Sequence, residues 1–204
     1  MEISFLLRGF MIGLSIAAPV GPIGVLCIRR TLASGRLSGL VSGLGAATAD
    51  AIYGCIAGFG LAFISNFLVS QQLWFRLIGG AFLCYLGIKT FLAKPAEQAA
   101  SAKGNGLFGD YASTLFLTIT NPMTIISFVA IFAGLGLASA SGNYASAGVL
   151  VLGVFIGSAM WWLLLSSGIA LFREKVNQRG LHWVNRISGT IILGFGLFAL
   201  WSVV

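Results

Sequence analysis

One interrupted apolar stretch limits what this chain can fold into more than any other feature. Residues 9–28 carry no charge, and a helix of these twenty residues, at about 1.5 Å each, spans the ~30 Å hydrocarbon core of a bilayer. Pro19, Gly21 and Pro22 lie in the middle of this run. Proline lacks a backbone N–H and its ring collides with a preceding carbonyl, and backbone groups freed inside lipid need protein or water as partners. The break therefore predicts a site near the middle of a membrane.

The composition indicates an integral membrane protein. The 204 residues are 58% hydrophobic and 8% charged, whereas about a quarter of the residues in a soluble domain are charged. The net charge of +7 raises the question of nucleic-acid binding, but the basic residues lie between apolar runs, so we expect a lipid bilayer and no nucleic acid as partner. Glu2 and the length of the first apolar run argue against a cleaved secretory signal, so we expect that span to be retained.

Six apolar runs predict six transmembrane helices in an all-α membrane protein. We place them at about 9–28, 37–64, 77–92, 110–137, 145–172 and 187–204. The polar segment 94–109 is rich in Ala, Gly and Ser and predicts a flexible cytoplasmic linker. It separates a first three-helix repeat, 1–93, from a second, 110–204.

The basic residues predict an orientation. Ten of the twelve Lys and Arg residues lie in or beside the connectors after spans 1, 3 and 5, and the other side has only Arg8 and Arg76. Because cytoplasmic loops carry the excess of Lys and Arg, these three connectors should be cytoplasmic and both termini extracytoplasmic. We therefore expect a multi-pass membrane protein in this orientation.

The two halves repeat the same order of local motifs. Pro22 and Pro122 both lie just past the middle of their spans, which predicts broken helices 1 and 4. Matching positions at the same spacing are Leu44, Gly45, Asp50 and Tyr53 in span 2 and Leu152, Gly153, Ser158 and Trp161 in span 5. Because each copy holds three spans, the second must be inserted upside down. Secondary transporters have such inverted repeats, with their sites between discontinuous helices.

Asp50 is the expected proton-coupling residue. It is the only acid deep inside a predicted span, and an ionised Asp at a bilayer centre costs about 2.5–3.5 kcal/mol on insertion scales. A structural Asp hydrogen-bonded to a broken helix is one interpretation. A proton carrier or an anchor for a substrate ammonium is the other, and these two functional roles are compatible.

The helix breaks supply the groups expected to bind substrate. The helix after Pro22 begins with free N–H groups suited to a carboxylate, and the carbonyls from Ser15 to Ala18 are suited to an ammonium or a coupling ion. Asn121 and Pro122 should act likewise from the second half, unless these prolines only kink helices for packing. The expected substrate-binding set is Ser15, Ala18, Pro19, Gly21, Pro22, Thr118, Asn121 and Pro122, with Tyr53, Ser158 and Trp161 as candidates to line a cavity.

Other chemistry lacks the residues that it needs. The chain has one His, no second deep acid to pair with Asp50 and no phosphate loop, so we expect no enzyme, no cofactor and no metal site. Cys27, Cys55 and Cys84 lie in different apolar runs and form no CxxC pair. Glycines along span 2 favour close helix contact, either within one chain or between the protomers of a homodimer.

The chain resembles the LysE/RhtB superfamily of amino-acid exporters over essentially its whole length. The resemblance is carried by the sequence PVGP at 19–22, Ala49 with Asp50, and Asn121 with Pro122. It implies export of an amino acid from the cytoplasm, driven by the proton-motive force through antiport.

Departures from the superfamily patterns bear on the substrate. Exporters of basic amino acids typically read PLGPQN, and Ile23 and Gly24 replace the two amides. Exporters of threonine, homoserine and leucine typically read SPGP, where this chain has APVGP, but the sequence NPMTI at 121–125 looks more like that neutral branch. We expect a small neutral amino acid, with a basic amino acid or another small solute or ion of the same superfamily as the alternative.

Two further classes have less sequence support. A membrane thiol–disulfide carrier needs cysteines that can meet near both breaks, and residues 108–204 contain none. A non-transporting scaffold would leave the costly Asp50 and the paired helix breaks without a role.

Overall fold

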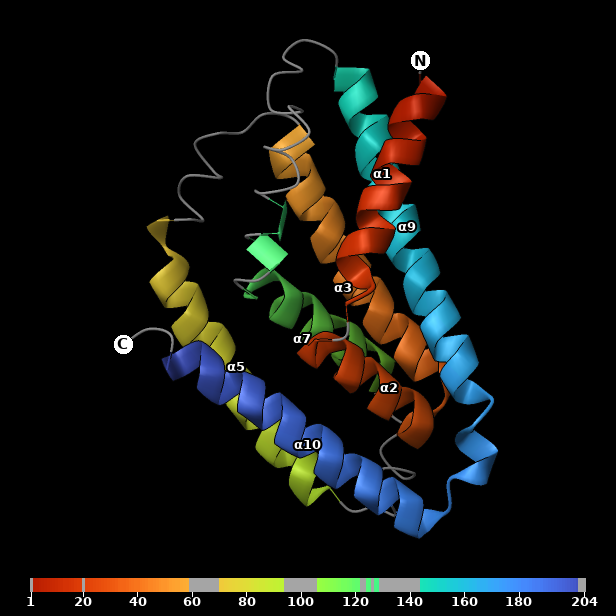
Figure 1. Ribbon diagram of the computed structural model, residues 1–204, viewed down its shortest axis with the longest axis vertical. Coiled ribbons are helices and arrows are strands. Elements are labelled where there is room, and N and C mark those ends of the chain that lie inside the picture. Colours follow the sequence, from red (N-terminus) through yellow and green to blue (C-terminus); the bar gives the residue numbers. More distant parts are fainter. Residues whose placement is uncertain are drawn as a thin grey trace.

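In the computed structural model, every secondary-structure element among the described residues is a helix, and these residues contain no strand. The structure describes residues 2–19, 21–58, 70–93, 106–121, 124–125, 127–128 and 144–201. The helices shown in Figure 1 are α1 (Glu2–Ala17), α2 (Pro22–Ser34), α3 (Arg36–Gly58), α5 (Gln72–Leu92), α7 (Gly106–Ile119), α9 (Tyr144–Ala170), the short 3₁₀ helix η2 (Arg173–Lys175) and α10 (Gln178–Trp201).

Among the described residues, four helices, α3, α5, α9 and α10, are long and apolar enough to cross a membrane. The α1–α2 pair is a fifth candidate, with a bend of 80° at the predicted break. The predicted fourth span, 110–137, begins within α7, but 122–123, 126 and 129–137 lie outside the described residues. The all-α membrane class is confirmed, and the sixth span stays a prediction.

Several predicted boundaries differ from the observed helices. α1 begins at Glu2 rather than near 9, α2 continues to Ser34 rather than ending near 28, and α5 begins at Gln72 rather than near 77. α10 begins at Gln178, within the predicted connector before span 6, and α7 begins at Gly106, within the predicted linker 94–109. An apolar run marks the residues that lie in lipid, whereas a helix continues into the interface wherever its polar side chains find partners. In the part of α10 that precedes the predicted span, the Arg186 guanidinium lies 4.9 Å from the centre of the Phe91 ring. Residues 59–64 of the predicted second span and 94–105 of the linker lie outside the described residues.

The helices form a row and a pair. α1 packs along α9, α9 along α3, and α3 along α7, while α5 and α10 form a separate pair. α2 contacts α3, α9 and α10, and so connects the row with the pair. Figure 1 shows the α5–α10 pair lying obliquely to α1 and α9.

Glycines bring α1 and α9 into backbone contact. A methyl group added at Gly13 would lie 2.1 Å from the carbonyl oxygen of Val154, and one added at Gly157 would lie 2.1 Å from that of Phe10. A methyl group added at Gly9 would lie 2.0 Å from the carbonyl oxygen of Leu150, and one added at Gly153 would lie 2.4 Å from that of Leu6. Each helix thus presents the small-xxx-small spacing that lets membrane helices approach, since lipid supplies no hydrophobic force between them.

The connectors predicted to be cytoplasmic meet at one end of the bundle. Arg29, near the end of α2, donates from Nε to the Asn185 side chain at 3.2 Å. Asn185, near the start of α10, donates in turn to the carbonyl of Ala93 at 3.2 Å, just after α5. We call this end the basic end. The side of the membrane that it faces remains a prediction.

The α1–α9 contact predicts a position-specific effect on stability. Gly153→Leu should lower the free energy of unfolding by about 1–3 kcal/mol, because α1 must move away from α9 to admit the side chain. Gly148→Leu is the control on the same helix, since nothing lies within 4 Å of an added methyl group there. Thermal unfolding of the purified protein measures both, and equal unfolding temperatures for the two variants would contradict this packing.

Candidate functional site

Asp50 is buried where α3 meets α9. Its side chain is 3% exposed, and its Oδ2 accepts a hydrogen bond of 2.7 Å from the hydroxyl of Ser158 on α9. The indole Nε1 of Trp162 donates to the Ser158 oxygen at 3.2 Å, which fixes the hydroxyl toward Asp50. Among the described residues, no basic side chain forms an ion pair with Asp50. A carboxylate buried with one neutral donor is costly to keep ionised.

The first helix break has the predicted form. α1 ends at Ala17, and α2 begins with Pro22 at its first position, where proline is favoured. Gly21 caps α2 in an extended conformation, and its carbonyl accepts the first bond of the helix, 3.1 Å from the Val25 nitrogen. Val20 lies outside the described residues.

The break packs against both α3 and α9. Ala17 and Ile23, on its two sides, share an apolar cluster with Ala46, Ala47 and Trp162. Ala46 and Ala47 form the turn of α3 before Asp50, so the break lies against the same stretch of α3 as the buried carboxyl. Of the residues predicted at this break, Pro22 is buried, Ala18 and Gly21 are half-buried, and Ser15 and Pro19 are exposed.

The second break meets α3 one turn further along. α7 ends at Ile119, and the Tyr53 hydroxyl donates to the Ile119 carbonyl, one of those that a helix end leaves without a partner. The chain turns helical again after Asn121, whose carbonyl accepts bonds from the nitrogens of Thr124 and Ile125 at 3.1 and 3.3 Å. Pro122 lies outside the described residues.

The structure brings some of the predicted residues together and leaves others apart. Asp50 meets Ser158, and Tyr53 meets the second break. Thr118 is buried, but its hydroxyl donates to the Thr114 carbonyl of its own helix at 2.8 Å. Trp161 packs half-buried against the apolar cluster, whereas its neighbour Trp162 makes the hydrogen bond to Ser158.

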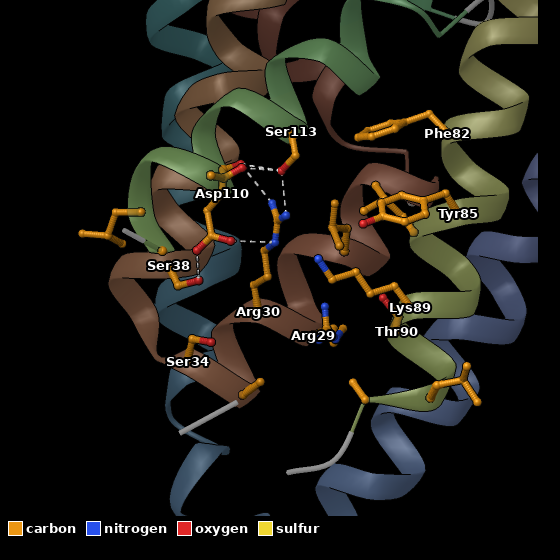
Figure 2. Close-up of a pocket in the computed structure, with 18 of the residues that line it drawn as sticks. Arg29, Arg30, Ser34, Ser38, Phe82, Tyr85, Lys89, Thr90, Asp110 and Ser113 are labelled. Carbon is orange, nitrogen blue, oxygen red and sulfur yellow. Dashed lines mark hydrogen bonds and ion pairs between the residues drawn. The ribbon is translucent and has the colours of Figure 1, made fainter. Parts of the chain in front are cut away.

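An ion-pair network that the sequence does not predict lies at the basic end. Arg30 Nε lies 3.0 Å from Asp110 Oδ1, and the Ser38 hydroxyl donates to the other carboxylate oxygen. The remaining guanidinium nitrogens of Arg30 donate at 2.7–2.9 Å to the hydroxyls of Ser42, Ser113 and Thr114 and to the Asp110 carbonyl. The network joins α2, α3 and α7, as Figure 2 shows.

Little in the sequence points to this network. We assigned Arg30 to a cytoplasmic connector and Asp110 to the start of a span, because charges at span ends usually face the interface. The residues lie 80 positions apart, so no spacing links them. The closely spaced hydroxyls of Ser113 and Thr114 were the one local hint of a buried polar partner.

A cavity of about 840 Å³ adjoins the network between α2, α5 and α7. Arg30, Ser38, Asp110 and Ser113 form part of its wall. None of the residues predicted from the helix breaks lines this cavity, so it is distinct from the surroundings of Asp50.

The cysteines are free thiols on three different helices. Cys27 is buried in α2, and Cys55 and Cys84 are half-buried in α3 and α5. Cys27 belongs to the apolar cluster that packs against the first break.

Removing Arg30 should destabilise the protein strongly. Arg30→Ala leaves the Asp110 carboxylate, only 19% exposed, without its counter-charge, and we expect a loss of about 3 kcal/mol in the free energy of unfolding. Arg36→Ala removes the same charge from an exposed position nearby and should cost less than about 0.5 kcal/mol. Unfolding curves of the two purified variants measure the difference. Equal losses of unfolding free energy in the two variants would show that the Arg30–Asp110 ion pair does not stabilise the fold.

Comparison with known sequences identifies the family of this chain. The sequence model of the LysE type translocator family matches residues 14–202. The putative amino acid efflux protein YcgF of Bacillus subtilis strain 168 is 29% identical over 193 residues, covering 92% of this chain and 91% of YcgF. The threonine efflux protein of Escherichia coli K12 is 24% identical over 195 residues, covering 89% and 90%. The uncharacterized membrane protein YahN of E. coli K12 is 27% identical over 177 residues, covering 85% and 77%.

No solved structure matches the chain. The family match includes both helix breaks, Asp50 and Ser158, and leaves out only the two ends of the sequence. This chain therefore belongs to the LysE type translocator family.

Proposed function

We propose that this protein exports a small neutral amino acid from the cytoplasm in exchange for protons. The family and the relatives named as amino acid and threonine efflux proteins support amino-acid export. The observation that carries the proton-coupled form is Asp50, a carboxyl group buried between two helices beside both breaks. A group of this kind inside a membrane helix is typical of a proton or ion pathway.

Two equivalent contacts support the inverted repeat. A methyl group at Gly45 would lie 2.4 Å from the carbonyl oxygen of Tyr111 and 3.1 Å from the nitrogen of Leu115, four residues later. At Gly153 it would lie 2.4 Å from the carbonyl oxygen of Leu6 and 2.8 Å from the nitrogen of Phe10, also four residues later. Around the matched glycines Gly45 and Gly153, the α3–α7 and α9–α1 contacts thus use the same pair of backbone atoms, a carbonyl oxygen and a nitrogen four residues later.

The bond between Asp50 and Ser158 supports the same symmetry. These residues occupy matching positions of the two repeats and touch each other. Residues related by a two-fold axis can meet only close to that axis. The axis proposed for the repeats therefore passes near the buried carboxyl, where transporters of this architecture bind their substrates.

The proton step follows from the chemistry of Asp50. Facing outward, the carboxylate takes a proton from the external water. Facing inward, it gives that proton to the cytoplasmic water as the ammonium group of the amino acid takes its place. The substrate carboxylate then lies against the free N–H groups at the start of α2, after Pro22. Rocking of one repeat against the other carries substrate out and the proton in.

The surroundings of the first break favour a neutral substrate. Ile23 is buried in the apolar cluster, and Gly24 beside it is also buried. These positions offer no polar side chain that could bind a cationic substrate side chain. A neutral substrate also agrees with the relatives that are named as threonine efflux proteins. We further propose a bacterial plasma membrane with both termini outside, because the basic end then faces the cytoplasm.

Proteoliposomes loaded with single amino acids test this function. Acidifying the outside should speed the efflux of alanine, threonine or leucine but not of lysine. Asp50→Asn keeps an oxygen for Ser158 but cannot carry a proton, so the acid-driven rate should fall about 100-fold. Glu174→Gln, which removes an exposed acid, is the control and should transport normally. Acid-driven efflux at the parent rate in Asp50→Asn would remove Asp50 from the mechanism, and efflux of lysine alone would favour the basic branch.

A further inference from the structure

The cavity at the basic end is lined by an excess of positive charge. Among the described residues that line it, Arg29, Arg30 and Lys89 are basic and Asp110 is the one acidic residue. It is roomy enough for a small organic ion, at about 840 Å³. The three basic side chains come from α2 and α5, which face each other across it (Figure 2).

Arg30 is already neutralised. All three of its guanidinium nitrogens are engaged by the carboxylate, the carbonyl and the hydroxyls of the network. Arg30 and Asp110 thus form a fixed wall, and the uncompensated charge of the cavity comes from the other two basic residues.

Arg29 is held in place by one edge only. Its Nε donates to the Asn185 side chain, which is fully buried and also donates to the Ala93 carbonyl. The bond to Asn185 anchors the guanidinium at Nε. Among the described residues, no hydrogen-bond acceptor is found for its two terminal nitrogens. A guanidinium held in this way presents a preformed pair of donors that suits a carboxylate.

Lys89 supplies the second charge from the opposite wall. Its ammonium lies 5.7 Å from the centre of the Tyr85 ring, and Figure 2 shows it directed into the space in front of Arg29 and Arg30. Two cations that converge across a cavity repel each other, and an anion bound between them would relieve that repulsion.

We propose that this cavity is a loading site that binds the carboxylate group of the amino acid between Arg29 and Lys89 before the acid reaches Asp50. The inference rests on the proposed function, which makes the basic end the side from which substrate enters. It also gives the protein a second basis for selectivity, because a cationic side chain entering this cavity would meet two like charges.

An apolar cluster separates the loading site from Asp50. Leu26 and Leu86 line the cavity and belong to the cluster that also contains Trp162. Trp162 in turn binds Ser158, the partner of Asp50. A substrate must therefore pass between these side chains, so loading and the release of the proton from Asp50 are separate steps.

Two readouts test the loading site. The first is efflux kinetics in proteoliposomes with the basic end facing the lumen. Lys89→Gln should raise the KM for threonine about tenfold with little change in maximal rate, and Lys89→Arg should restore it. Lys175→Gln is the control, since Lys175 is exposed at the same end, lies over the Phe172 ring and does not line the cavity.

The second readout does not depend on transport. The thiol introduced by Ser34→Cys lies in the cavity wall, and its labelling by N-ethylmaleimide is followed by mass spectrometry. Alanine, threonine and leucine should slow this labelling, whereas their amides, which lack the carboxylate, should not. Adding Arg29→Gln should abolish the protection. The thiol introduced by Asn177→Cys, exposed outside the cavity, should label at one rate throughout.

The outcomes separate the two proposals. Normal transport with an unchanged KM in Lys89→Gln and no protection by the acids would overturn the loading site alone. Protection by the acids without any amino-acid transport would overturn the proposed function alone. Protection by phosphatidylglycerol, in vesicles without amino acid and compared with pure phosphatidylcholine, would assign the cavity to a lipid headgroup and overturn the loading site.

Discussion

The hydrogen bond between Ser158 and Asp50 is the interaction on which the rest of this structure depends. It places a carboxyl group in the low-dielectric interior of a membrane protein and gives it one neutral donor. Such a group is tolerated only where packing holds its partner in place, and here Trp162 fixes the serine from the next turn of α9. The α3–α9 contact is thus both a packing contact and the chemical centre of the molecule.

The helix breaks are arranged around this contact. The first lies against the turn of α3 before Asp50, and Tyr53, one turn after it, donates to the end of α7 at the second. One face of α3 therefore organises both interruptions. Backbone groups that would be costly in lipid become part of a polar centre shielded by α1, α7 and α9.

Local features of the sequence were enough to predict part of this site. Pro19 and Pro22 are incompatible with the interior of a continuous helix, and α2 begins at Pro22 as expected. Asp50 stood out because an acid is costly in an apolar span, and the repeat alone paired it with Ser158. These predictions concern backbone stereochemistry and solvation, which act over a few residues.

Long-range partners were beyond the sequence. Arg30 and Asp110 looked like interfacial charges, and only the fold shows that they meet across α2 and α7. Whether Trp161 or Trp162 contacts Ser158 depends on the rotation of α9 about its axis. The sequence of an almost uniformly apolar helix does not reveal that rotation. Helix ends were also misplaced where α10 and α7 extend beyond their apolar runs, because interfacial contacts rather than lipid set those ends.

The central claim is that an amino acid and a proton compete for Asp50. The most direct measurement is proton release on binding, followed with a pH-sensitive dye as a transported amino acid is added to the purified protein in weak buffer. The account predicts release of about one proton per bound molecule, and none from Asp50→Asn even where that variant still binds. Binding without proton release in the parent protein, or the same release from Asp50→Asn, would contradict it.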